Sequence, residues 1–112
     1  SAEPWRAIVD QQERLRTGLE AIYGWYERNA SLAGCVLRDA EQHALTAEIV
    51  EMRFGPYMAS YLEVLGPRLS KSQHAVLVLA LSFFTWRSLV RDGALDTPLA
   101  AKVMARAIAS AT

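Results

Sequence analysis

Apolar residues recur along this chain at the three- and four-residue spacing of an α-helix, and no segment alternates as a half-buried strand does. The first apolar stripe passes through Ile8, Leu15 and Ile22, one face of a helix. Pro4 suits the first position of a helix, because its missing N–H is not needed there. The pattern therefore predicts one long helix over residues 4–28.

Two further helices are predicted in the middle of the chain. The first is short and covers residues 32–41. The second covers residues 44–65 and contains Gly55 followed by Pro56. Proline inside a helix removes a backbone hydrogen bond and clashes with the preceding turn, so we expect a kink at 55–56.

The last two predicted helices cover residues 71–91 and 98–111. Ser70 and Gln73 form a capping-box pattern at the start of the first of them, and Thr97 precedes a first-turn proline at the start of the second. Residues 71–91 are apolar on nearly every side, which is typical of a helix that is enclosed all round. The fold class predicted from the whole pattern is all-α, with five helices.

A domain of 112 residues has little volume with which to enclose such a helix. The most economical partner for the remaining apolar surface is a second copy of the chain, so we predict that the last two helices form a four-helix bundle between two subunits. The alternative is that these helices are the core of a monomeric bundle. The residues predicted at the dimer interface are Leu77, Leu81, Thr85, Leu89, Val103, Met104, Ala107 and Ile108.

Composition narrows the possible functions. The chain is 52% hydrophobic, which indicates one folded domain and excludes intrinsic disorder. Twelve basic residues balance twelve acidic ones, so the formal net charge is zero. Because proteins that grip nucleic acid usually carry a basic excess, we do not expect this chain to bind DNA by itself.

Candidate reactive residues are few. The single cysteine, Cys35, cannot form an intrachain disulfide, which favours a reducing, cytoplasmic location. Cys35, His43 and His74 do not have the spacing of a metal site, and the chain contains no catalytic or cofactor-binding motif. We therefore expect no metal, no cofactor and no enzymatic activity. The longest apolar run, residues 75–86, is shorter than the ~20 residues that a membrane helix needs.

Aromatic and methionine residues gather near the end of the first predicted helix, around the Gly55-Pro56 kink and in the last apolar helix. Tyrosine offers an apolar ring with one polar tip, and methionine adapts its shape. Such residues suit a cavity for a mostly apolar small ligand, although the same residues also build ordinary cores. The predicted ligand-binding residues are Tyr23, Tyr26, Val36, Met52, Tyr57, Met58, Tyr61 and Phe84.

Two arginines lie beside these apolar segments. Arg38 next to Asp39 either forms a solvated ion pair or orients a polar group of a ligand at the mouth of a cavity. Arg87 lies within the apolar run, where it either forms a pair across a dimer face or extends its charged end to water.

Several segments together resemble a known family. The chain reads AIYGWYERN over residues 21–29, VLRDAE over 36–41 and FFTWRSL over 83–89, with Pro-Trp at 4–5 and Pro-Tyr at 56–57. In these segments it resembles the C-terminal domain of TetR/AcrR-type transcriptional repressors, and the resemblance covers nearly the whole chain.

The resemblance implies an all-helical domain that binds a small effector among its helices and dimerises through its last two helices. It also implies that operator DNA is bound only through an N-terminal helix-turn-helix, which this chain does not contain. Effector binding would then shift the dimer and release the operator. The alternative function is a freestanding helical protein–protein interaction module that binds no ligand.

Overall fold

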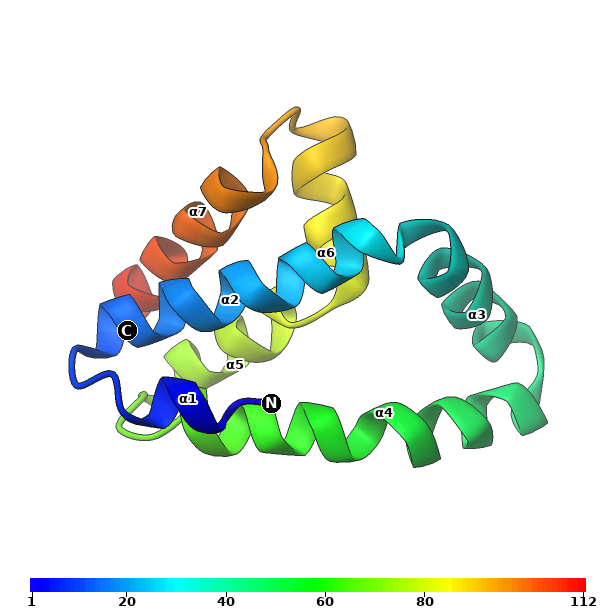
Figure 1. Cartoon of the computed structure of the whole chain (residues 1–112), viewed down its shortest axis with the longest axis horizontal. Coiled ribbons are helices and arrows are strands. Elements are labelled where there is room, and N and C mark those ends of the chain that lie inside the picture. Colours follow the sequence, from blue (N-terminus) through cyan, green and yellow to red (C-terminus); the bar gives the residue numbers. More distant parts are fainter.

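The computed structural model describes all 112 residues, and every element in it is a helix (Figure 1). The all-α prediction is confirmed, but there are seven α-helices instead of five. Their bounds are α1 Glu3–Arg6, α2 Gln11–Arg28, α3 Ala30–Gln42, α4 Ala44–Leu65, α5 Lys71–Ala80, α6 Phe83–Arg87 and α7 Thr97–Ser110, with a π-helical turn at Ser88–Asp92 after α6.

The single helix predicted over residues 4–28 is wrong, because the chain leaves the helix after Arg6 and starts α2 at Gln11. Asp10 causes the restart: its backbone is extended, and its carboxylate accepts a hydrogen bond from the backbone N–H of Glu13 at 2.8 Å. The break lets α1 fold back beside α2 and α4, where Trp5 is buried.

The single helix predicted over residues 71–91 is also wrong. It is interrupted at Leu81 and Ser82, and the two halves meet at a bend of 70°. The Ser82 hydroxyl caps the second half by accepting a hydrogen bond from the backbone N–H of Phe84 at 3.2 Å. The prediction over 98–111 fits α7 to within one residue at each end.

The helix α2 is central, because it contacts α1, α3, α4, α6 and α7. Its buried face carries Leu15, Leu19 and Tyr23, and all three side chains are almost completely enclosed. The facing surface of α7 is rich in alanine, including the fully buried Ala101 and Ala105, so the two helices can approach closely. Gly18 performs the same role where α2 meets Leu65 of α4.

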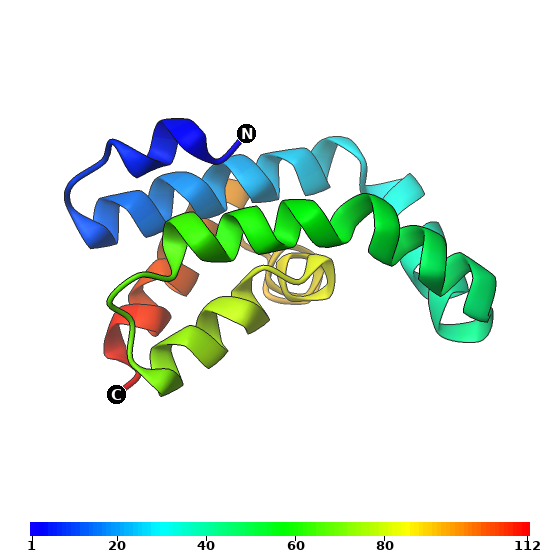
Figure 2. The same cartoon turned by 90° about the horizontal axis from the view of Figure 1, so that it is seen from below.

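The helices α3 and α4 form an arm that extends from this body, as Figures 1 and 2 show. No residue of α3 is buried, and α4 buries only Val64 and Leu65 near its end. The predicted limits of the second helix in this arm, 44–65, are those observed. Pro56 lies inside α4 without ending it, and Figure 2 shows α4 as one continuous ribbon that curves toward α3.

No single helix combines the length and the apolar composition required to cross a membrane. The bent pair formed by Lys71–Ala80 and Phe83–Asp92 passes that test by length and composition only.

Two glycines of α2 allow the packing to be tested by a matched pair of substitutions. A Cβ added at Gly18 would lie 2.9 Å from Cδ2 of the buried Leu65, whereas at Gly24 it would meet only the mobile Nη1 of Arg28, at 3.3 Å. Alanine favours a helix by about 1 kcal/mol over glycine, but overpacking costs about 1–3 kcal/mol. We expect Gly24→Ala to raise the free energy of unfolding by up to about 1 kcal/mol and Gly18→Ala to lower it by about 1 kcal/mol.

Urea denaturation of both variants measures the difference. Equal stabilisation by the two substitutions would show that Leu65 can move aside, and would contradict the tight crossing of α2 and α4.

Candidate ligand-binding site

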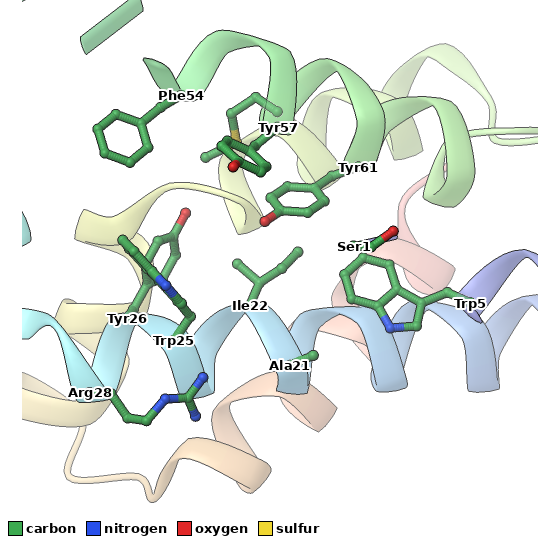
Figure 3. A pocket seen from close by; sticks show the side chains of 11 residues that line it. Ser1, Trp5, Ala21, Ile22, Trp25, Tyr26, Arg28, Phe54, Tyr57 and Tyr61 are labelled. Atoms are coloured by element: carbon green, nitrogen blue, oxygen red, sulfur yellow. The ribbon is translucent and has the colours of Figure 1, made fainter. Parts of the chain in front are cut away.

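A cleft of about 490 Å³ lies between α2 and α4, with α1 at one end (Figure 3). Nine of its eleven lining residues are hydrophobic. The volume is within the usual range for small-molecule sites, about 300–1,000 Å³. The lining residues are Ser1, Trp5, Ala21, Ile22, Trp25, Tyr26, Arg28, Phe54, Tyr57, Met58 and Tyr61.

The wall formed by α2 presents positions three and four residues apart, which share one side of a helix. Ile22 and Tyr26 form its buried part, and the half-exposed Trp25 stands at the opening. The Tyr26 hydroxyl is turned away from the cleft, since it donates to the carbonyl oxygen of Leu81 at 2.6 Å. Tyr26 therefore offers the cleft an aromatic ring and no free polar group.

The wall formed by α4 has the same helical spacing, through Phe54, Tyr57, Met58 and Tyr61. In Figure 3 the hydroxyl of Tyr61 points into the space between the two helices. Burial, followed by the neighbouring Tyr57, raises the pKa of the Tyr61 phenol above its usual value. The hydroxyl is therefore protonated at neutral pH and can both donate and accept a hydrogen bond.

Aromatic pairs join the two walls at each end of the cleft. Trp25 of α2 meets Phe54 of α4 edge-on, with ring centroids 6.4 Å apart. Trp5 of α1 lies 5.7 Å from the ring of Tyr61. The cleft is therefore bordered by aromatic contacts between its helices.

Arg28 carries the only charged side chain in the lining. It lies in the last turn of α2, and its side chain runs back along that helix, with Nη1 3.3 Å from the position that a Cβ would take at Gly24. In Figure 3 the guanidinium lies on the side of α2 that faces away from α4, so a ligand would meet it at the outer rim of the cleft. The five ion pairs of the chain do not include Arg28.

Four of the eight predicted ligand-binding residues lie around this cleft, namely Tyr26, Tyr57, Met58 and Tyr61. The other four are placed elsewhere. Tyr23 is fully buried and donates to the carbonyl oxygen of Ala80 at 2.6 Å, and Val36 lies half-buried on α3. Met52 is 78% exposed on α4, outside the lining.

Phe84 belongs to a second, smaller cleft between α3 and α6, with Arg38, Glu41 and Arg87. The guanidinium of Arg87 lies 4.9 Å from the centre of the Phe84 ring, a cation–π contact. Arg38 does not pair with Asp39, and its nearest partner is the sulfur of Cys35 at 3.6 Å. Nowhere in the chain do three His, Cys, Asp or Glu side chains meet as a metal site would require.

Several lining residues were missing from the predicted site, above all Trp5, Ile22, Trp25, Arg28 and Phe54. Two signals in the sequence could have indicated them. The Asp10-x-x-Glu13 spacing is an N-cap pattern, and a helix start at residue 11 frees Trp5 to fold back. Ala21, Trp25 and Arg28 are spaced four and three residues apart and share a helix face, which places an arginine on the same face as Trp25.

The predicted interface residues are divided between the core and the surface. Leu77, Leu81, Met104 and Ile108 are buried within the chain itself, so they do not reach a second copy. Thr85 and Leu89 are partly buried, while Val103 and Ala107 are exposed on α7. The remaining apolar surface on these helices comes from Ala75, Val78 and Leu79 of α5 and Leu99 of α7, all exposed.

Comparison of the chain with protein-family models, curated proteins and solved structures finds no match. The class of protein defined by these features is an all-helical domain with an aromatic cleft between two helices.

Proposed function

We propose that this chain is the effector-binding and dimerising domain of a TetR-like transcriptional repressor. The observation that carries the proposal is the cleft between α2 and α4. Nine of its eleven lining residues are hydrophobic, and they include six aromatic side chains from three helices, together with Met58. Its size and composition suit a small, mostly apolar effector. The segments that resemble the TetR family supply the rest of the proposal.

A ligand in this cleft would join the body of the domain to the arm. One wall belongs to α2, the centre of the core, and the other belongs to α4, which buries only two residues of its own. A molecule that contacts both walls favours the position of the arm in which both contacts are made. It can shift the equilibrium between arm positions only by as much as its affinities for those positions differ. In the intact repressor this shift would alter the dimer and release the operator.

The proposed dimer face consists of two exposed apolar stripes. The first is formed by Ala75, Val78 and Leu79 of α5, and the second by Leu99, Val103 and Ala107 of α7. The two helices pack against each other, and the side-chain amide of Gln73, at the start of α5, donates to the carbonyl oxygen of Ala109, near the end of α7. The two stripes therefore lie on neighbouring antiparallel helices, and two-fold pairing would bury them as a four-helix arrangement.

The cleft is tested by truncating one wall. N-phenyl-1-naphthylamine is an uncharged probe that fluoresces in apolar sites, and we expect the wild-type chain to bind it. Replacing Tyr57 and Tyr61 together with alanine should weaken its binding by about 10- to 100-fold, because at a half-open cleft the two truncations together remove about 1.4–2.8 kcal/mol of apolar contact. Dimerisation should be unchanged, since α4 carries neither stripe.

Met52→Ala is the matched control, because Met52 is also an exposed residue of α4 but lies outside the lining. A loss of probe binding in the control equal to that in the tyrosine variant would show that the probe binds the outer surface of the arm. Loss of the dimer with intact probe binding would reverse the assignment of the two faces.

A protein–protein interaction module is the second candidate, and the surface of the arm favours it. Leu32, Leu45, Ile49 and Met52 are all large, apolar and between 47% and 78% exposed. Exposed apolar surface of this extent on a small domain often marks a contact with another protein. A thermal-shift screen separates the two functions, because a ligand at 100 times its dissociation constant adds about 2.7 kcal/mol of stability. The module would show no shift with any apolar compound.

A further inference from the structure

We propose that the effector of this cleft is an amphipathic organic acid, whose apolar body lies between α2 and α4 and whose acidic group binds Arg28. This inference rests on the proposed function, since it assigns the chemical class of the ligand at the same site. It is carried by the combination of an apolar lining with one unpaired guanidinium at its edge.

Two acidic side chains on the helices that form the cleft, Glu27 on α2 and Glu51 on α4, have other neighbours than Arg28. Glu27 precedes Arg28 on α2, but its carboxylate accepts a hydrogen bond from the hydroxyl of Thr97 at 3.0 Å, on the side of α7. Glu51 lies one turn before Phe54 on α4, and its carboxylate is folded over Gly55, 2.7 Å from the position that a Cβ would take there. The lining itself contains no carboxylate.

The chemistry of the guanidinium selects among ligands. Arginine presents five N–H donors in a planar arrangement that matches the two oxygens of a carboxylate, and it keeps its charge at any physiological pH. A neutral ligand would leave these donors unused. The aromatic walls alone would also attract an apolar cation, but a cation would be repelled by Arg28 and would find no carboxylate in the lining. An anion with an apolar body satisfies both parts of the site.

The test uses two fluorescent probes that differ by one acidic group. 1-Anilinonaphthalene-8-sulfonate is an anion, and N-phenyl-1-naphthylamine is the same molecule without the sulfonate. For the full chain we expect Arg28→Ala to weaken binding of the anionic probe about tenfold, the usual size of a charge-assisted contact at a half-open site, and to change binding of the neutral probe less than twofold. Arg28→Lys should restore part of the anion binding.

Arg106→Ala is the matched control, because Arg106 is exposed on α7, belongs to no ion pair and is not in the lining. This variant removes the same charge from the chain and should leave both probes unaffected. Added salt should weaken binding of the anionic probe to the wild-type chain and should have little effect on its binding to Arg28→Ala.

The outcomes separate the two proposals. Equal affinities of the anionic probe for the wild-type chain and Arg28→Ala would overturn the assignment of an acid while leaving an apolar cleft. If Arg28→Ala weakened binding of both probes equally, the assignment of an acid would also be overturned, since Arg28 would then only maintain the structure of the cleft. Failure of the wild-type chain to bind the neutral probe would instead refute the proposed function, and with it the site to which an acid was assigned.

Discussion

Replacing Tyr23 and Tyr26 together with phenylalanine should lower the free energy of unfolding by about 2–6 kcal/mol, because each substitution leaves a buried carbonyl without its donor, at a cost of about 1–3 kcal/mol. The two hydroxyls donate to consecutive carbonyl oxygens, those of Ala80 and Leu81, both at 2.6 Å. Small domains have about 5–15 kcal/mol of stability in total, so the double variant should be close to unfolding.

The reason for this size of effect is the break between α5 and α6. Where a helix is interrupted, the carbonyls of its last turn lose their intrahelical donors and require others. The carbonyl oxygen of Leu79 still accepts from the backbone N–H of Ser82 at 3.2 Å and also from the Thr85 hydroxyl at 2.7 Å, and the two tyrosines supply donors to the next two carbonyls. The carbonyls of Ala80 and Leu81 thus depend on side chains of α2 for their donors.

Urea denaturation of the two single variants and the double variant measures the effect, and Tyr57→Phe is the control, since its ring is 59% exposed. The control should change stability by less than about 0.5 kcal/mol. A double variant as stable as the control would contradict the prediction and show that water replaces both hydroxyls.

The dependence of stability on pH gives the same test a second readout. Burial raises the pKa of the Tyr23 and Tyr26 phenols in the folded chain, and a neighbouring tyrosine adds to the rise at each. The unfolded chain loses these protons near pH 10, so the stability they contribute is complete below about pH 10 and declines above it. Above about pH 10 the free energy of unfolding of the wild-type chain should fall by up to about 1.4 kcal/mol per pH unit for each phenol. The double variant has neither phenol, so its free energy of unfolding should not show this part of the decline.

The same break shows where sequence reasoning fails. Residues 79–84 contain no glycine or proline, and their apolar character alone favours a continuous helix. The interruption depends on Ser82 as a local cap and on the two tyrosines more than fifty residues earlier in the chain. A tertiary contact of that range has no signature in the local pattern.

Pro56 shows the opposite case. It is the strongest helix-breaking signal in the chain, yet α4 continues through it. The backbone hydrogen bond that it removes would have ended on the carbonyl of Met52, and both residues are exposed, so water can serve that carbonyl. Sequence periodicity was sufficient for the arm and for α7, where each helix is set by its own residues.

The candidate site was predictable only in part for a related reason. Periodicity correctly brought together Tyr57, Met58 and Tyr61, since their spacing places them on one side of any helix. It could not place Trp5 against Tyr61, because that contact depends on the fold-back of α1. It also could not distinguish Tyr23, whose hydroxyl is used inside the core, from a tyrosine that lines a cleft.

A glutamate placed at Leu79 and another at Val103 should convert the proposed homodimer to a monomer. Both side chains are exposed in the single chain, by 57% and 37%, so the substitutions should leave its fold intact. Two-fold pairing would bring four carboxylates into the interface, and each unpaired buried charge costs several kcal/mol. The dissociation constant should rise by about a thousandfold or more, since about 4 kcal/mol is sufficient for that change. Native mass spectrometry measures it: the 12.4 kDa chain should be a dimer and the variant a monomer.

Glutamates at Leu32 and Leu45 form the matched control, because these residues are equally apolar and more exposed, at 67% and 69%, but lie on the arm. The control should remain a dimer. If the control dissociates instead, the arm is the association face and the stripes on α5 and α7 are not. The cleft and the interface would then share α4, and an effector would act on the dimer directly through that helix. A monomeric wild-type chain would refute both faces and return α5 and α7 to the core of a single-chain bundle.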